Sequence, residues 1–119
     1  MTHSIGDKLS GFKREITQER VNSYAEASGD HNPIHLDAAY AASTQFGTRI
    51  AHGMLSLALV TEMLAIDFPK TWHSGGNLKV RFSAPVISGE TVKIYGEITN
   101  ITETNLGLIA TCSIGCKKP

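Results

Sequence analysis

Two residues able to exchange protons, Asp30 and His35, flank a stretch that cannot remain helical. Pro33 lacks an amide hydrogen and disfavours helical geometry at the residue before it, while Gly29 can adopt backbone conformations closed to other residues. We therefore expect a helix to end near Ser28 and a tight loop to carry both side chains. A carboxylate and an imidazole held close together can share one water molecule for general acid–base chemistry.

The same loop also has a simpler interpretation. Asp and Asn after a glycine are ordinary loop formers, so Asp30 and His35 could do no more than end the helix. Asn32 is expected to hydrogen-bond to the backbone and orient the loop, because Asn side chains readily mimic a turn.

A metal site is the other chemistry to weigh, since His31 and His35 have the i, i+4 spacing of a helical metal pair. Pro33 interrupts that helix, and no further Cys, His or carboxylate cluster in the sequence offers the remaining ligands. We therefore expect no metal, and we expect His31 to be a solvated loop residue. His3 and His73 are expected in loops.

His52-Gly53-Met54 opens an apolar stretch and reads as the start of a helix. The first amides of a helix have no internal acceptor and carry the positive end of the helix dipole. Gly53 has no side chain to block approach, so its N–H could receive an anionic oxygen. Simple packing of the helix start is the alternative.

The stretch from Tyr24 to His35 contains Gly-Asp-x-Asn-Pro-x-His and resembles the hydratase signature of the MaoC-like, (R)-specific enoyl-CoA hydratase family. A second stretch, Phe46-Gly-Thr-Arg-Ile-Ala-His-Gly-Met54, is similar to another block of that family. The resemblance covers roughly Tyr24 to Met63 and fits the later strands more loosely. It implies a hot-dog fold, an α+β architecture in which an antiparallel sheet wraps around a long central helix.

The resemblance also implies a reaction. Asp30 and His35 would act together in adding water reversibly across a trans-2-enoyl-CoA thioester to give the (3R)-3-hydroxyacyl-CoA, and the Gly53 amide would bind the thioester oxygen. Coenzyme A would be part of the substrate, and no separate cofactor is expected. An acyl-CoA thioesterase, a (3R)-hydroxyacyl-ACP dehydratase and a non-catalytic acyl-binding subunit remain as alternatives.

Secondary structure in the first half is expected to begin with a strand over Lys8 to Ile16. Thr17 is a suitable cap for a helix that ends near Ser28. Asp37 can cap a second, short helix over Ala38 to Ala42.

The second half begins with Met54 to Ile66, which is apolar on almost every side and predicts a fully buried helix. A loop should follow from Asp67 to Gly76 because Pro69 stops the helix. Alternating apolar residues then predict three antiparallel strands, which lie over Leu78 to Ser83, Val92 to Thr99 and Leu108 to Cys116.

Length and charge limit the classes of function. The 119 residues are expected to form one domain, 1–119, with a small core. In the fold that the resemblance implies, single domains commonly pair with their sheets joined edge to edge, so we expect a homodimer. Eleven acidic and eleven basic residues balance, which argues against a nucleic-acid partner. The longest apolar run is shorter than the roughly 20 residues that span a bilayer, and the start has no signal-peptide core, so we expect a cytoplasmic protein with no membrane association. Cys112 and Cys116 are expected to be free thiols.

Overall fold

The computed structural model describes residues 3–118. One strand near the start of the chain and a final hairpin form one antiparallel sheet, and the helices lie in the chain between them. In chain order the elements are β1 (Phe12–Glu15), α1 (Gln18–Ser28), α2 (Pro33–Leu36), α3 (Ala38–Ala42), α4 (Gly53–Asp67), α5 (Trp72–Gly75), β2 (Thr91–Thr104) and β3 (Gly107–Lys117).

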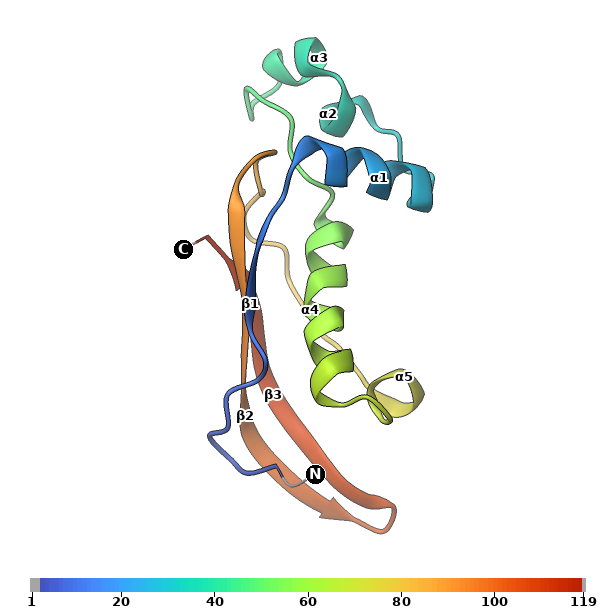
Figure 1. Ribbon diagram of the computed structural model, residues 1–119, viewed down its shortest axis with the longest axis vertical. Helices are drawn as coiled ribbons and strands as arrows, with labels where there is room; N and C mark the ends of the chain where they lie inside the picture. Colours follow the sequence, from blue (N-terminus) through green and yellow to red (C-terminus); the bar gives the residue numbers. More distant parts are fainter. Residues whose placement is uncertain (1–2, 119) are drawn as a thin grey trace.

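The sheet has the strand order β1-β2-β3, so β2 lies in the middle. Phe12 is opposite Ile94 in the first pair, and Ile94 is opposite Cys116 in the second. The long helix α4 lies along one face of this curved sheet, and α1, α2 and α3 gather beyond its amino end (Figure 1). The expected α+β architecture of an antiparallel sheet around a central helix is confirmed.

The core lies between α4 and the sheet. Val92, Ile94 and Ile98 alternate along the buried face of β2, and Met63 is fully buried on the facing side of α4. Gly96 completes this face because a Cβ there would lie 3.1 Å from the Met63 methyl group. A glycine on β2 therefore lets the helix pack closely against the strand.

The helix α4 is buried on one side only. Leu59, Val60, Met63 and Leu64 are buried, whereas Met54 is 54% and Ile66 is 55% exposed. The expectation of a fully buried helix was wrong for this single chain, because the sheet covers one face of α4 and leaves the apolar residues of the opposite face exposed.

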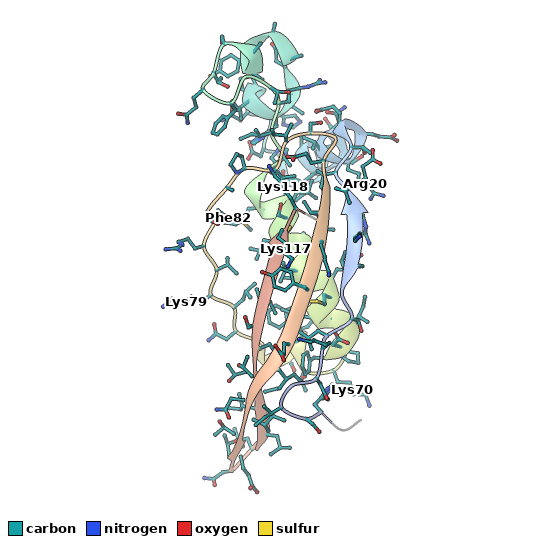
Figure 2. The ribbon with its side chains drawn as sticks, turned by 90° about the vertical axis from the view of Figure 1, so that its left-hand side faces the viewer. Arg20, Lys70, Lys79, Phe82, Lys117 and Lys118 are labelled. Carbon is teal, nitrogen blue, oxygen red and sulfur yellow. The ribbon has the colours of Figure 1, made fainter. Side chains whose placement is uncertain are left out.

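One of the three expected strands is absent from the described part of the chain. Residues 78–83 have the alternating side chains of a strand, but their backbone makes no hydrogen bond to another backbone among residues 3–118. They lie apart from β3 (Figure 2). An alternating pattern predicts which face a strand would bury, but a strand forms only where a neighbouring backbone accepts its hydrogen bonds. The next residues do find one, since Ala51 N–H donates to Val86 O at 2.8 Å.

The other two expected strands form the hairpin β2–β3, and both cysteines on it are free, as predicted. The first strand is shorter than expected: β1 keeps only Phe12–Glu15, and Lys8 makes an isolated bridge to Glu97. Gly11 passes so close to β2 that a Cβ would lie 2.7 Å from the Ile94 carbonyl oxygen.

Helix ends follow the predicted caps. Thr17 Oγ1 accepts the Arg20 N–H at the start of α1, and Gly29 ends that helix with a φ of 79°. Asp37 caps α3 in the same way. The expected loop over 67–76 instead contains the short helix α5, which carries His73. No helix among residues 3–118 is long and apolar enough to cross a membrane.

Candidate active site

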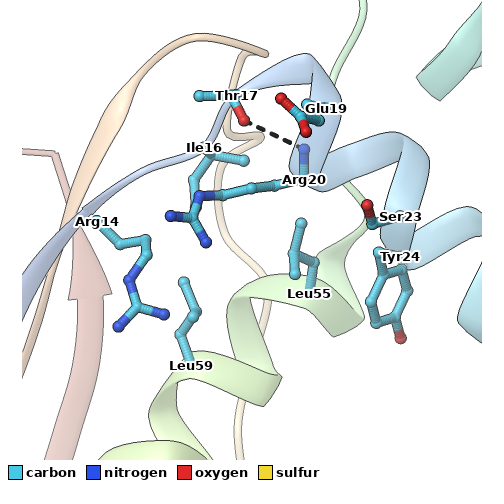
Figure 3. A pocket seen from close by; sticks show the side chains of 9 residues that line it. All are labelled: Arg14, Ile16, Thr17, Glu19, Arg20, Ser23, Tyr24, Leu55 and Leu59. Atoms are coloured by element: carbon cyan, nitrogen blue, oxygen red, sulfur yellow. Dashed lines mark hydrogen bonds between the residues drawn. The ribbon is translucent and has the colours of Figure 1, made fainter.

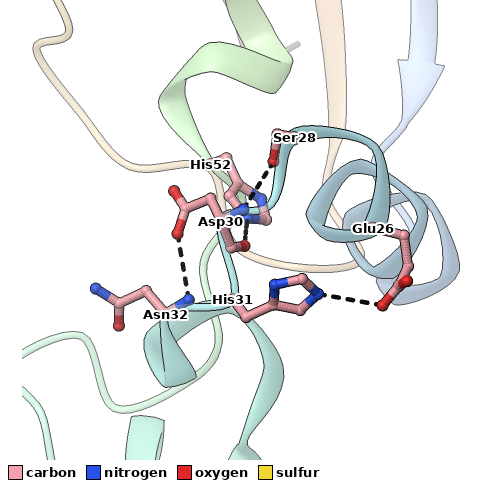
Figure 4. Close-up of polar contacts among 6 residues, drawn as sticks. All are labelled: Glu26, Ser28, Asp30, His31, Asn32 and His52. Carbon is pink, nitrogen blue, oxygen red and sulfur yellow. Dashed lines mark hydrogen bonds and ion pairs between the residues drawn. The ribbon is translucent and has the colours of Figure 1, made fainter.

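The loop after α1 carries Asp30 with its carboxylate exposed (Figure 4). The Asp30 N–H donates to Ser28 Oγ at 3.2 Å, and its Oδ1 accepts the Asn32 N–H at 3.2 Å. These two local bonds shape the turn around Asp30, which is the arrangement expected where a helix is broken by Gly29.

Asn32 lies at the start of α2 and links that helix to the loop. Its Oδ1 accepts the Ile34 N–H at 3.1 Å and so caps α2, while its own N–H bonds to Asp30. The Asn32 side chain thus hydrogen-bonds to the backbone, as predicted for a residue that orients the loop.

His35 lies in α2, not in the loop where the sequence placed it, because Pro33 occupies the first helical position and Asn32 caps a new turn. The residue is 9% exposed. Its Nδ1 lies 2.8 Å from the Ile50 carbonyl oxygen. A carbonyl can only accept, so Nδ1 carries the hydrogen in the neutral ring and Nε2 is left with a free lone pair.

His52 joins this pair, although the sequence did not single out its side chain. It is 2% exposed, and its ring stacks on that of His35 with centroids 3.8 Å apart. One potential ligand atom from each of Asp30, His35 and His52 lies within 4.8 Å of the other two. The available signal was its place beside Gly53 in the second block of the resemblance.

Gly53 is the first residue of α4, so its amide belongs to the turn whose N–H groups have no acceptor inside the helix. His52 occupies the capping position without a side-chain capping bond. A groove of about 840 Å³ opens beside Gly53, with Ser56 and Phe82 among its lining residues. An oxygen could therefore approach the Gly53 amide at a short distance from His52.

A second groove, of about 610 Å³, lies on the other side of the first turns of α4 (Figure 3). Tyr24 and Leu55 are among its lining residues, together with Arg14 and Arg20. The Tyr24 and His52 ring centroids are 4.8 Å apart, so this groove comes close to the His52 ring.

Asp30, His35 and His52 are also the three residues that could hold a metal ion among residues 3–118. The His35 and His52 rings are stacked and inclined by only 27°. The expectation of no metal stays a prediction. His31 lies outside the cluster, exposed and 3.1 Å from Glu26.

Comparisons with known proteins identify the family of the chain. The family model of the MaoC like domain matches residues 2–110. A 3-hydroxybutyryl-CoA dehydratase of Methylorubrum extorquens is 37% identical over 106 residues, which are 87% of this chain and 68% of that protein. The 3-hydroxyacyl-thioester dehydratase Z of Mycobacterium tuberculosis is 40% identical over 79% of this chain and 65% of its own length.

An (R)-specific enoyl-CoA hydratase of Aeromonas caviae is 35% identical over 83% of this chain and 73% of its own length. The solved (R)-hydratase from A. caviae superposes with a TM-score of 0.81 at 29% identity, covering 97% of this chain and 85% of that one. The chain thus spans about two-thirds to three-quarters of the curated relatives it matches. With its helix-and-sheet core and its Asp30–His35 loop, the chain belongs to the family of MaoC-like domains and has the hot-dog fold of their hydratases and dehydratases.

Proposed function

We propose that the protein is an (R)-specific 2-enoyl-CoA hydratase that adds water reversibly to trans-2-enoyl-CoA thioesters. The observation that carries this proposal is the meeting of Asp30 and His35 beside the amino end of α4. Relatives named hydratase or dehydratase support both directions of one equilibrium. The (3R) product is proposed from the names of the (R)-specific relatives.

The chemistry follows from the free groups of the site. A water molecule held between the Asp30 carboxylate and His35 Nε2 loses one proton to this pair, and its oxygen forms a bond to the β-carbon. The π electrons of the double bond between the α- and β-carbons shift toward the thioester carbonyl, and the Gly53 N–H stabilises the negative charge on its oxygen. The pair then returns the proton to the α-carbon, so that one water is added and the site is restored.

The rate factors typical of such groups predict a large acceleration of hydration by this site. Positioned proton transfer contributes on the order of 10²–10⁴ in rate. One oxyanion donor contributes about 10²–10³ more. Asp30 and His35 are treated as one unit because interacting groups titrate together.

The first experiment follows purified protein with crotonyl-CoA, recording loss of the enoyl-thioester absorbance and release of free thiol together. Absorbance loss without thiol, with a (3R) product, supports the hydratase. Thiol release would instead identify a thioesterase. Turnover restricted to acyl carrier protein substrates would identify the dehydratase of carrier-bound acyl chains.

Substitution of the pair tests the residues themselves. Asp30→Asn and His35→Asn should each abolish turnover while the circular dichroism spectrum stays unchanged. His31→Asn is the matched control, since His31 is an exposed histidine of the same loop and should keep wild-type turnover. Substantial activity in both single variants of the pair would refute the proposed roles.

Assembly and location are part of the same proposal. We infer a homodimer because apolar side chains of α4 and of the unpaired segment 78–83 are exposed, among them Met54 and Phe82. Light scattering should then give twice the 12.8 kDa chain mass, and a mass equal to one chain at micromolar concentration would contradict it. The two free thiols agree with a cytoplasmic location.

A further inference from the structure

The segment between α3 and α4 holds both proposed catalytic residues. The Ile50 carbonyl accepts from His35 Nδ1 at 2.8 Å, and two residues later His52 Nε2 lies 3.0 Å from the Asp30 carbonyl oxygen. The segment itself is fixed on its other side, since Ala51 N–H donates to Val86 O at 2.8 Å. One short anchored stretch therefore sets the distance between Asp30 and His35.

The two hydrogen bonds assign opposite tautomers to the two stacked rings. Both acceptors are backbone carbonyls, which cannot donate, so the nitrogen facing each carbonyl must carry the hydrogen. His35 is then the Nδ1–H form, and His52 is the Nε2–H form. In His52 the remaining nitrogen, Nδ1, is buried and has no hydrogen-bond partner among residues 3–118.

His52 is an unusual residue for its local position. It precedes the first residue of α4, where Ser, Thr, Asp or Asn would normally bond to the free amides of the helix. His52 makes no such bond, and its ring turns instead toward the Asp30 loop. The buried His52 ring therefore does not cap the helix, and one of its two nitrogen atoms, Nδ1, has no hydrogen-bond partner among residues 3–118.

The contacts of His52 with the Asp30 turn and with His35 explain why a histidine occupies this position. Apart from the bond from His52, the turn around Asp30 is shaped by bonds between near neighbours in sequence, from Ser28 and Asn32. The bond from His52 spans 22 residues and ties that turn to the start of α4. The same ring forms the surface on which His35 stacks at 3.8 Å.

We propose that His52 is a positioning residue, which in its Nε2–H tautomer holds the Asp30 main chain and seats the His35 ring for the proposed hydration. The inference rests on the proposed function only for the reaction that it serves. The tautomer and the hydrogen bond are properties of the protein without substrate.

The direct test is the nitrogen chemical shifts of the histidine rings in ¹⁵N-labelled wild-type protein. The expected result is an Nε2–H ring for His52 and an Nδ1–H ring for His35. An Nδ1–H ring for His52 would overturn the proposal. Because this measurement needs neither substrate nor variant, it decides the inference even if crotonyl-CoA is not turned over, which would count against the proposed function alone.

A pair of variants tests the consequence for turnover. The amide nitrogen of Gln can take the place of Nε2, whereas that of Asn reaches only the place of Nδ1. His52→Gln should keep kcat within about threefold of wild type, and His52→Asn should lose on the order of 10²-fold in kcat with KM little changed, as a misplaced group does.

A merely structural role predicts a different pattern, in which both variants lower the melting temperature alike and kcat per folded molecule is unchanged. That pattern would overturn the proposal, as would folded His52→Asn protein with wild-type kcat. If neither variant folds, the ring tautomers decide.

Discussion

Gly53 combines two properties that are separable by substitution. Its amide is the proposed donor to the thioester oxygen, and its missing side chain leaves room beneath the Phe82 ring, which a Cβ would approach to 3.3 Å. The position is the first of a helix, where proline is tolerated because the N–H has no helical acceptor. The preceding residue, His52, has a φ of −61° and a ψ of 134°, an extended conformation that is compatible with a proline at the next position.

Gly53→Pro should therefore fold normally and lose about 10²–10³ in kcat, because the donor hydrogen is gone. Gly53→Ala is the control, since it also adds a Cβ near Phe82 but keeps the N–H. Steady-state kinetics with crotonyl-CoA and a thermal melt check the pair. Equal activity of the two variants would mean that the amide does not act as the donor.

His31 offers a pH prediction outside the site. The hydrogen bond from its ring to Glu26 is the largest cause that raises the pKa of His31 above 6.5, and the backbone at Gly29 adds to it. The stabilisation from this pair is complete below the ordinary imidazole pKa and is lost as the pH rises through the raised value. Glu26→Gln should lower the His31 titration midpoint in an NMR titration, and an unchanged midpoint would contradict the pairing.

The helices differ in how much of their position is local. α1, α2 and α3 each begin directly after a residue whose side chain caps the helix, namely Thr17, Asn32 and Asp37, and α1 ends at Gly29. α4 has no such cap and is held by packing of its buried side against β2 and β3. Its stability should therefore depend on which face a residue occupies.

Met63→Ala should cost about 2–5 kcal/mol in the free energy of unfolding, because the fully buried side chain leaves a cavity against Gly96. Ile66→Ala, on the same helix and 55% exposed, should cost much less in the monomer. Urea unfolding followed by circular dichroism measures both. A larger loss for Ile66→Ala at high protein concentration would show that a partner chain buries it.

On both sides of one groove, backbone groups lack hydrogen-bond partners among residues 3–118. Segment 78–83 has no backbone hydrogen bonds among residues 3–118, and β3 pairs only with β2 there. The groove between them, about 840 Å³, also reaches Gly53. Open strand edges of this kind favour association with another backbone.

Hydrogen exchange should reflect this arrangement. Amides of residues 78–83 should exchange quickly at low protein concentration, while those of Ile94 and Ile98 in the middle of the sheet should exchange slowly. If the proposed homodimer pairs at this edge, protection of 78–83 should rise with protein concentration. Strong protection at a concentration where the chain is monomeric would show that the segment is paired within one chain.

What could be read from the sequence was decided by interactions between near neighbours. Gly29 ends α1 and Pro33 begins α2, while Thr17 and Asp37 begin α1 and α3 by accepting hydrogen bonds from amides two or three residues away. For this reason the helix ends and the Asp30 loop were predicted correctly. The turn that places His35 in α2 was missed, although its cap, Asn32, was identified as a backbone-bonding residue.

Only the tertiary structure decided the rest, because the deciding contacts join distant residues. The hydrogen bonds from His35 to Ile50 and from His52 to Asp30 span 15 and 22 residues. Local sequence patterns therefore do not predict that the His52 side chain is the third member of the site. Residues 78–83 have the alternating side chains typical of a strand, but a strand forms only beside a neighbouring backbone, and residues 3–118 supply none there. Sequence determined the reactive groups and local turns, and the fold determined which groups meet.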